Sequence, residues 1–134
     1  MVNIFVYGSL RPGYYNWDRF ELHKYAEILK SSHIMHGAAL KRVHAKIGGK
    51  KEYLGYPAMF RHPTGTVVGD LIRIHNELVA QELFMMEVGA GYTPYTIMIN
   101  EFPAVVFMAS EVHKTHRDVL NDTSIPFISE FPKE

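Results

Sequence analysis

The chain has 134 residues and a mass of 15.4 kDa, with 47% hydrophobic and 21% charged residues, which indicates one globular domain over residues 1–134 and excludes disordered and fibrous classes. Fourteen Lys and Arg residues balance fourteen Asp and Glu residues, so the formal net charge is zero and a nucleic-acid partner is disfavoured. The absence of cysteine excludes disulfides, thiolate metal sites and a cysteine nucleophile.

The amino terminus carries no pattern that directs a protein to a membrane. Residues 1–7 contain no basic segment and no apolar run long enough for a signal peptide. Nothing in the sequence approaches the roughly 20 apolar residues of a membrane-spanning helix. We therefore expect a cytoplasmic protein without a membrane partner.

The first third of the chain predicts a strand, a helix and a second strand. Residues 4–7 form a β-branched and aromatic run that stops at Gly8, and its continuous apolar character indicates a strand buried on both faces. Asn16 is a candidate cap for a helix over residues 16–29. Residues 34–43 are expected to form a strand of mixed character.

The middle of the chain predicts loops and one strand. Residues 46–51 indicate a flexible basic loop and residues 55–57 a turn. The basic residues between 41 and 51 are interpreted as the solvated rim of a hairpin, with steering of an anionic peptide or nucleotide as the alternative. Residues 66–74 are typical of a strand, in which Gly69 indicates a bend or bulge.

The last third predicts a helix and a pair of strands. Asn76 is expected to cap a helix over residues 77–86 that is ended by two glycines. Residues 95–100 and 104–108 are typical of paired strands, and the tail from residue 123 of irregular coil. Because strands outnumber helices and the helices fall between them, we expect an α+β domain with a strongly bent or closed sheet.

Glu87 is the most informative residue of the second predicted helix. It follows Leu83 by four residues and Ala80 by seven, so a helix that continues this far projects it from the apolar side. Apolar surroundings and the negative end of the helix dipole both raise the pKa of a carboxyl group, which suits a general acid or base. The alternative is that the helix ends one residue earlier and Glu87 turns into solvent.

The end of the first strand is a second candidate site. A buried strand that runs into Gly8 and Ser9 leaves backbone N–H groups without a sheet partner. Glycine lets such a turn form a concavity that holds an anion or a carboxylate. The alternative is that this turn has no chemical role, as in many strands that end in Gly-Ser.

Together these features resemble a known family. Residues 6–13, which read Val-Tyr-Gly-Ser-Leu-Arg-Pro-Gly, resemble the amino-terminal signature of the γ-glutamylcyclotransferase-like (AIG2-like) proteins. Further matches follow in the same order along the chain: Asn16, a Tyr-Pro-Ala turn at residues 56–58, a strand similar to Val-x-Gly-Glu at residues 68–71, and a Glu-(x4)-Tyr segment at Glu87 and Tyr92. The ordered set spans residues 4–108.

The resemblance implies a small, closed or strongly bent mixed β-barrel flanked by helices. It also implies an enzyme that converts a γ-glutamyl amide or γ-glutamylamine to 5-oxoproline and a free amine, with Glu87 as the catalytic general acid/base. The substrate-binding residues that it implies are Tyr7, Gly8, Ser9, Leu10 and Tyr92. Backbone amides of this loop would hold either the α-carboxylate or the developing oxyanion of the substrate.

The expected partner is a small-molecule γ-glutamyl compound. Its own α-amine is the nucleophile and is tethered to the amide that it attacks, so ring-closing geometry supplies much of the rate. No cofactor and no metal are expected, because this reaction requires neither.

Three positions depart from the family pattern. The family's aspartate is Phe84 here, the glycine after its glutamate is Val88, and the arginine after its tyrosine is Pro94. Phe84 and Pro94 together remove a charged pair, which is milder than removing one partner alone. The competing interpretation is a non-catalytic barrel that uses the same loop to bind a carboxylate-bearing small metabolite.

Two other chemistries are disfavoured. His33 and His36 are three residues apart on an expected strand and so face opposite sides, while His113 and His116 fit one helical turn but have no third ligand nearby. All four are therefore interpreted as surface histidines rather than metal ligands. Ser9 lacks a recognisable base partner for a nucleophile, and its expected role is hydrogen bonding within the loop.

Overall fold

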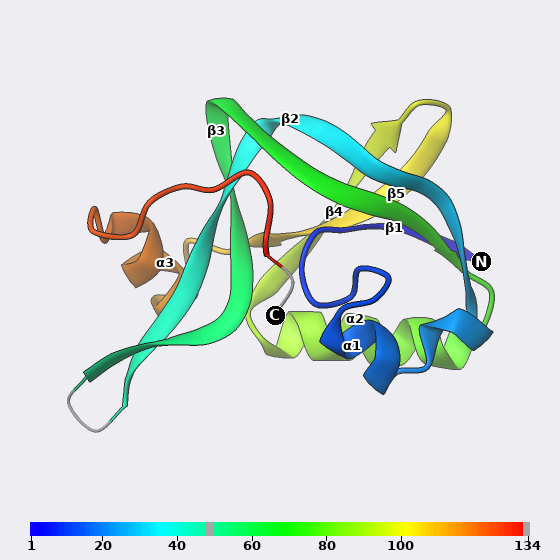
Figure 1. The fold of residues 1–134 in the computed structure, drawn as a ribbon, viewed down its shortest axis with the longest axis horizontal. Coiled ribbons are helices and arrows are strands. Elements are labelled where there is room, and N and C mark those ends of the chain that lie inside the picture. The colour runs from blue at the N-terminus through cyan, green and yellow to red at the C-terminus, as the bar shows by residue number, and fades with distance from the viewer. Residues whose placement is uncertain (48–49, 133–134) are drawn as a thin grey trace.

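The computed structural model describes residues 1–47 and 50–132. Its strands are β1 (Val2–Val6), β2 (Ala26–Ile47), β3 (Lys50–Ile74), β4 (Tyr92–Ile99) and β5 (Phe102–Ala109). They form a five-stranded sheet in the order β2-β3-β1-β5-β4, in which β1 is parallel to β5 and the other neighbours are antiparallel. Figure 1 shows that this sheet is strongly curled.

Helices flank the curled sheet. They are α1 (Tyr15–Arg19), the 3-10 helix η1 (Leu22–Lys24), α2 (Glu77–Gly89) and α3 (Lys114–Asn121). α2 contacts β3 and β4, whereas α3 contacts β2 and lies farther to the left in Figure 1. Within the described part of the chain, no helix is long and apolar enough to cross a membrane. The predicted α+β class with a strongly bent sheet is confirmed.

β1 is the central strand and is buried on both faces, as predicted. Successive side chains of a strand point to opposite faces of the sheet. Accordingly Ile4 and Val6 belong to one hydrophobic cluster, while Phe5 and Tyr7 belong to a second. All four side chains are buried, so the end of β1 is held rigidly between two cores.

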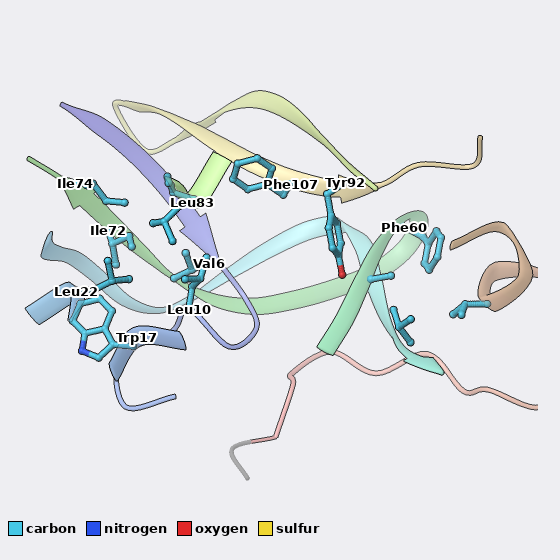
Figure 2. Close-up of a cluster of buried hydrophobic side chains, with 14 of the residues drawn as sticks. Val6, Leu10, Trp17, Leu22, Phe60, Ile72, Ile74, Leu83, Tyr92 and Phe107 are labelled. Carbon is cyan, nitrogen blue, oxygen red and sulfur yellow. The ribbon is translucent and has the colours of Figure 1, made fainter. Parts of the chain in front are cut away.

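The first cluster joins the helices to the sheet. Figure 2 shows the side chains of Val6 and Ile72 between Leu83 of α2 and Trp17 of α1, in one hydrophobic cluster. Leu83 is completely buried, and burying a leucine contributes about 1.5–3 kcal/mol to stability. This packing fixes the carboxy-terminal half of α2 relative to the end of β1.

β2 and β3 form a long antiparallel hairpin that extends away from the rest of the sheet (Figure 1). The strands predicted over residues 34–43 and 66–74 are confirmed but were too short, because β2 begins at Ala26 and β3 begins at Lys50. The register shifts four times along the hairpin. Each shift interrupts the alternation of apolar and polar residues that marks a strand in a sequence. One shift lies beside Gly69, which confirms the irregularity predicted there.

Two predictions for the hairpin need correction. The turn predicted at residues 55–57 is wrong, because these residues belong to β3. Pro57 is tolerated there because this part of β3 pairs only with β2 and therefore has one unpaired edge. The loop predicted at residues 46–51 is wrong at its ends, which belong to strands, while residues 48–49 lie outside the described residues.

The helix predicted over residues 16–29 is also wrong in its extent. Glu21 adopts a left-handed backbone conformation with φ of 52°, which ends the helical path after α1, and only one turn of 3-10 helix, η1, follows it. The chain then enters β2. Asn16 is not a helix cap, because its side chain bonds to Ser9 instead.

The second half of the chain agrees better with its predictions. Asn76 caps α2 by accepting a hydrogen bond from the Val79 N–H group at 3.1 Å. α2 continues to Gly89, beyond the predicted end, and β4 and β5 pair as expected. The sequence indicates only one helical turn around His113 and His116, whereas α3 is a complete helix over Lys114–Asn121. The irregular tail predicted from residue 123 follows it.

His116 on α3 corrects a further prediction, because it is completely buried rather than on the surface. Its Nδ1 accepts a hydrogen bond from the Ser110 N–H group at 3.2 Å. Its ring packs against the rings of Tyr92 and His113, with centroids 4.7 Å and 4.6 Å away. Burial and, secondarily, the charge of His113 lower the pKa of His116 from 6.5 to about 4.

This buried histidine is expected to contribute acid sensitivity to the fold. Between pH 6.5 and 4 the unfolded chain binds a proton at His116 that the folded chain does not, so the contribution of His116 to the free energy of unfolding falls as the pH is lowered. We expect this contribution to fall by about 1–2 kcal/mol between pH 6.5 and 5, measured by urea unfolding as the difference in pH slope between the wild-type protein and His116→Gln. His116→Gln should change the slope by this amount despite its lower stability at pH 7, whereas the exposed His36→Gln should keep the wild-type slope. An unchanged slope in His116→Gln would refute the assignment.

Candidate active site

A cavity of about 210 Å³ lies between the end of β1 and the last turn of α2. The six residues singled out from the sequence all line it: Tyr7, Gly8, Ser9, Leu10, Glu87 and Tyr92. The structure thus brings together residues that lie up to 85 positions apart, from Tyr7 to Tyr92. Their roles in binding and catalysis remain predictions.

The loop after β1 keeps three backbone N–H groups unpaired. The Ser9 carbonyl accepts hydrogen bonds from the N–H groups of Asn16 at 2.9 Å and Trp17 at 3.2 Å, and the Asn16 side chain donates to Ser9 Oγ at 2.7 Å. Within the described residues, the N–H groups of Gly8, Ser9 and Leu10 have no acceptor. Free N–H groups in a concave turn favour a bound anion or carboxylate.

Gly8 is required by the close approach of β3 to this loop. A Cβ atom at position 8 would lie 2.9 Å from Cδ of Pro57, closer than real Cβ contacts allow. A side chain here would therefore push the loop away from Pro57. The glycine lets the loop and β3 form two adjoining walls of the cavity.

Glu87 lies in the last turn of α2 and lines the cavity from the opposite side. The alternative of a helix that ends earlier and turns Glu87 into solvent is wrong, because the residue is partly buried and helical. Burial raises the pKa of its carboxyl group from 4.5 to about 7. A carboxyl group with this pKa both accepts and returns a proton near neutral pH.

Tyr7 and Tyr92 form the inner walls beside Glu87. The Tyr7 hydroxyl donates a hydrogen bond to the Phe107 carbonyl, and the Tyr92 hydroxyl donates to the Pro57 carbonyl. Burial raises the pKa of both phenols well above its usual value, so both stay protonated. Their hydroxyl groups hold the walls in place, which leaves their rings to face a ligand.

Arg11 fixes the outer side of the loop. Its Nε donates to Asp70 Oδ2 at 2.9 Å, and both side chains are buried. The second oxygen of Asp70 accepts from the Ser32 N–H group at 2.8 Å. Arg11 also donates to Glu130 in the carboxy-terminal tail at 3.3 Å. The loop is therefore tied to both β3 and the tail.

Two of the departures from the family pattern have a structural counterpart. Phe84 packs edge-on against Phe107 with their ring centroids 4.9 Å apart, so an aromatic contact holds α2 against β5. Pro94 is exposed on β4. α2 is thus secured beside the cavity by apolar packing rather than by the charged pair that these two positions lack.

Sequence reasoning did not assign Tyr56, Pro57 and Asn16 to this cavity, although all three line it. The segment of Tyr56 and Pro57 was interpreted only as a turn, and Asn16 was interpreted as a helix cap. The motif matches at these positions were the available signal. Within residues 1–43 and 56–132, whose side chains the structure describes, no group of three His, Asp or Glu side chains is placed to hold a metal ion.

Comparison with known proteins agrees with this geometry. A family model described as Gamma-glutamyl cyclotransferase, AIG2-like matches residues 4–124. No curated protein matches the chain significantly. Three solved structures share the fold at identities that support the fold alone. Protein YtfP of Escherichia coli is 19% identical with a TM-score of 0.61, and the match covers 96% of this chain and 93% of that chain. An uncharacterized protein of Pyrococcus horikoshii is 19% identical with a TM-score of 0.59, and the match covers 81% of this chain and 78% of that chain. An AIG2-like protein of Mus musculus is 17% identical with a TM-score of 0.59, and the match covers 98% of this chain and 88% of that chain.

The family match covers most of the chain, including the loop after β1 and the segment from Glu87 to Tyr92. With the shared fold, it establishes that the chain belongs to the AIG2-like gamma-glutamyl cyclotransferase family.

Proposed function

We propose that this protein is an enzyme that converts a γ-glutamyl amide or γ-glutamylamine to 5-oxoproline and a free amine. The α-amine of the substrate attacks the carbon of its own side-chain amide, and a five-membered ring closes. The bond from that carbon to the leaving nitrogen then breaks. No water is consumed, because the nucleophile and the electrophile belong to one molecule.

Glu87 is the proposed proton carrier. The α-amine is protonated at neutral pH and must lose a proton before it attacks, and the leaving nitrogen must gain one before it departs. A single carboxyl group performs both transfers when its pKa lies near the working pH, and burial raises the pKa of Glu87 to about 7.

The loop after β1 is the proposed binding element. The free N–H groups of Gly8, Ser9 and Leu10 would hold either the α-carboxylate or the developing oxyanion. Tyr7 and Tyr92 would shape the walls around the substrate. A substrate held in a ring-closing conformation reacts faster because its ends are already in contact.

One observation carries the proposal: a buried carboxyl group with a raised pKa and a set of unpaired backbone amides line the same small cavity. This pairing matches a reaction that needs one proton carrier and one anion-binding loop. Family membership supports a cyclotransferase, and the identity of the leaving amine is left to experiment.

The test is a panel of γ-glutamyl compounds with different leaving groups, namely amines, amino acids and ε-lysine isopeptides. We expect the wild-type protein to release 5-oxoproline from at least one member, measured by chromatography. If members of the panel bind but none is converted, the chain is instead a non-catalytic module that holds a carboxylate-bearing metabolite.

A further inference from the structure

Tyr56 occupies a defined position in the cavity. Its ring packs edge-on against Tyr92, with centroids 6.3 Å apart. The next residue, Pro57, contacts Gly8 and accepts the hydrogen bond of the Tyr92 hydroxyl. Tyr56 is therefore held on the wall formed by β3, beside the loop and facing the same space as Glu87.

The Tyr56 hydroxyl differs from those of the other tyrosines in the cavity. Tyr7 and Tyr92 donate their protons to main-chain carbonyls. In the part of the chain that the structure describes, the Tyr56 hydroxyl has no hydrogen-bond partner, although its ring is half-buried. Ser9 and Asn16, the other uncharged polar side chains of the lining, bond to each other. Tyr56 thus offers a phenolic proton that the protein itself does not use.

Tyr56 and the proposed proton carrier, Glu87, line the same cavity of about 210 Å³. Burial and then the charge of Glu87 raise the pKa of Tyr56, so the phenol stays protonated at the pH where Glu87 titrates. Glu87 must reach both nitrogens bonded to the reacting carbon. A donor close to Glu87 is therefore also close to the oxygen on that carbon.

We propose that the Tyr56 hydroxyl donates a hydrogen bond to the amide carbonyl oxygen of the substrate and to the oxyanion that develops on it. This assignment rests on the proposed cyclisation. It assigns one role to each group of donors in the cavity. The Tyr56 hydroxyl stabilises the oxyanion, and the loop amides of Gly8 to Leu10 bind the α-carboxylate. Tyr56 is then a catalytic residue, because it touches the reacting atoms.

Tyr56→Phe tests the assignment, because it removes only the hydroxyl and keeps the ring against Tyr92. Loss of one oxyanion donor lowers kcat by about 100-fold, and we expect this with a KM changed by less than about threefold. The oxygen of the ring carbonyl in 5-oxoproline is the same atom, so its affinity, measured by calorimetry, should weaken about fivefold. The melting temperature should not change. Tyr95→Phe, on the exposed face of β4, is the matched control and should leave kcat, KM, the affinity for 5-oxoproline and the melting temperature unchanged.

The outcomes separate this inference from the proposed function. If the wild-type protein converts a γ-glutamyl compound and Tyr56→Phe has the same kcat, the inference alone is wrong. If kcat falls only in step with a lower melting temperature, Tyr56 is structural and the inference is again wrong. If the wild-type protein converts no member of the panel, the proposed function fails and this assignment fails with it.

Discussion

Replacing Glu87 with glutamine is expected to lower the rate of 5-oxoproline release by about 10²–10⁴-fold, the usual contribution of a general acid/base. The amide has nearly the shape of the carboxyl group but cannot take the proton of the α-amine. In the wild-type protein, kcat/KM should rise with pH through an apparent pKa near 7, as the carboxylate form accumulates. Both quantities are measured by 5-oxoproline release with the best substrate of the panel.

Glu82→Gln is the matched control, since Glu82 is exposed on the same helix and does not line the cavity. It should retain the activity and the pH profile of the wild-type protein. A Glu87→Gln variant that keeps its activity would show that another group carries the proton.

Glu87→Gln is expected to raise the free energy of unfolding at neutral and alkaline pH, although it lowers the activity. The folded chain holds the Glu87 proton up to about pH 7, whereas the unfolded chain releases it near pH 4.5. The contribution of Glu87 to the free energy of unfolding therefore falls as the pH rises through this window, opposite in sign to the contribution of His116, and the full loss is present above pH 7. Glutamine stays neutral, so Glu87→Gln should be more stable at pH 8 by about 1–3 kcal/mol, after allowance for its partial exposure. The difference should vanish at pH 4. A functional carboxylate is thus predicted to cost stability, as at many active sites.

The sequence predicted the elements whose patterns are locally consistent. β1 was recognised because its side chains are apolar on both faces, and α2 because Asn76 caps it and Leu83 marks its buried side. The helix predicted over residues 16–29 failed because Glu21 leaves the helical conformation and the chain from Ala26 pairs with β3. Such long-range pairing overrides local helix propensity, and its partner cannot be identified from a short window of sequence.

The candidate site shows the same division. Glu87 stood out because a carboxyl group on an apolar helix side is unusual, and Gly8 because a glycine ends a buried strand. Tyr56 and Asn16 did not stand out, because their places in the cavity depend on contacts that a short window of sequence does not show. Tyr56 packs against Tyr92, and Asn16 bonds to Ser9. His116 was predicted to lie on the surface for the same reason, because the ring that buries it, Tyr92, comes from β4 and not from α3.

Removing Arg11 is expected to produce the largest loss of stability. Among the described residues, Arg11→Met leaves the buried carboxylate of Asp70 with the Ser32 N–H group as its one remaining partner. Breaking one side of a buried ion pair costs about 3–5 kcal/mol, which corresponds to a melting temperature lower by about 10–20 °C in a domain of this size. The loop that Arg11 ties to β3 also loosens, so KM should rise. Urea unfolding and steady-state kinetics measure the two effects.

A double-mutant cycle separates the ion pair from general packing. Arg11→Met combined with Asp70→Leu removes both charges, so the double variant should recover most of the stability that Arg11→Met loses. Lys114→Met, which breaks the exposed pair with Asp118 at 3.1 Å, is the matched control and should cost less than about 1 kcal/mol. If Arg11→Met costs no more than this control, the pair does not hold the loop. If the double variant is stable but its KM stays high, the charge pair positions the binding loop for substrate in addition to stabilising the fold.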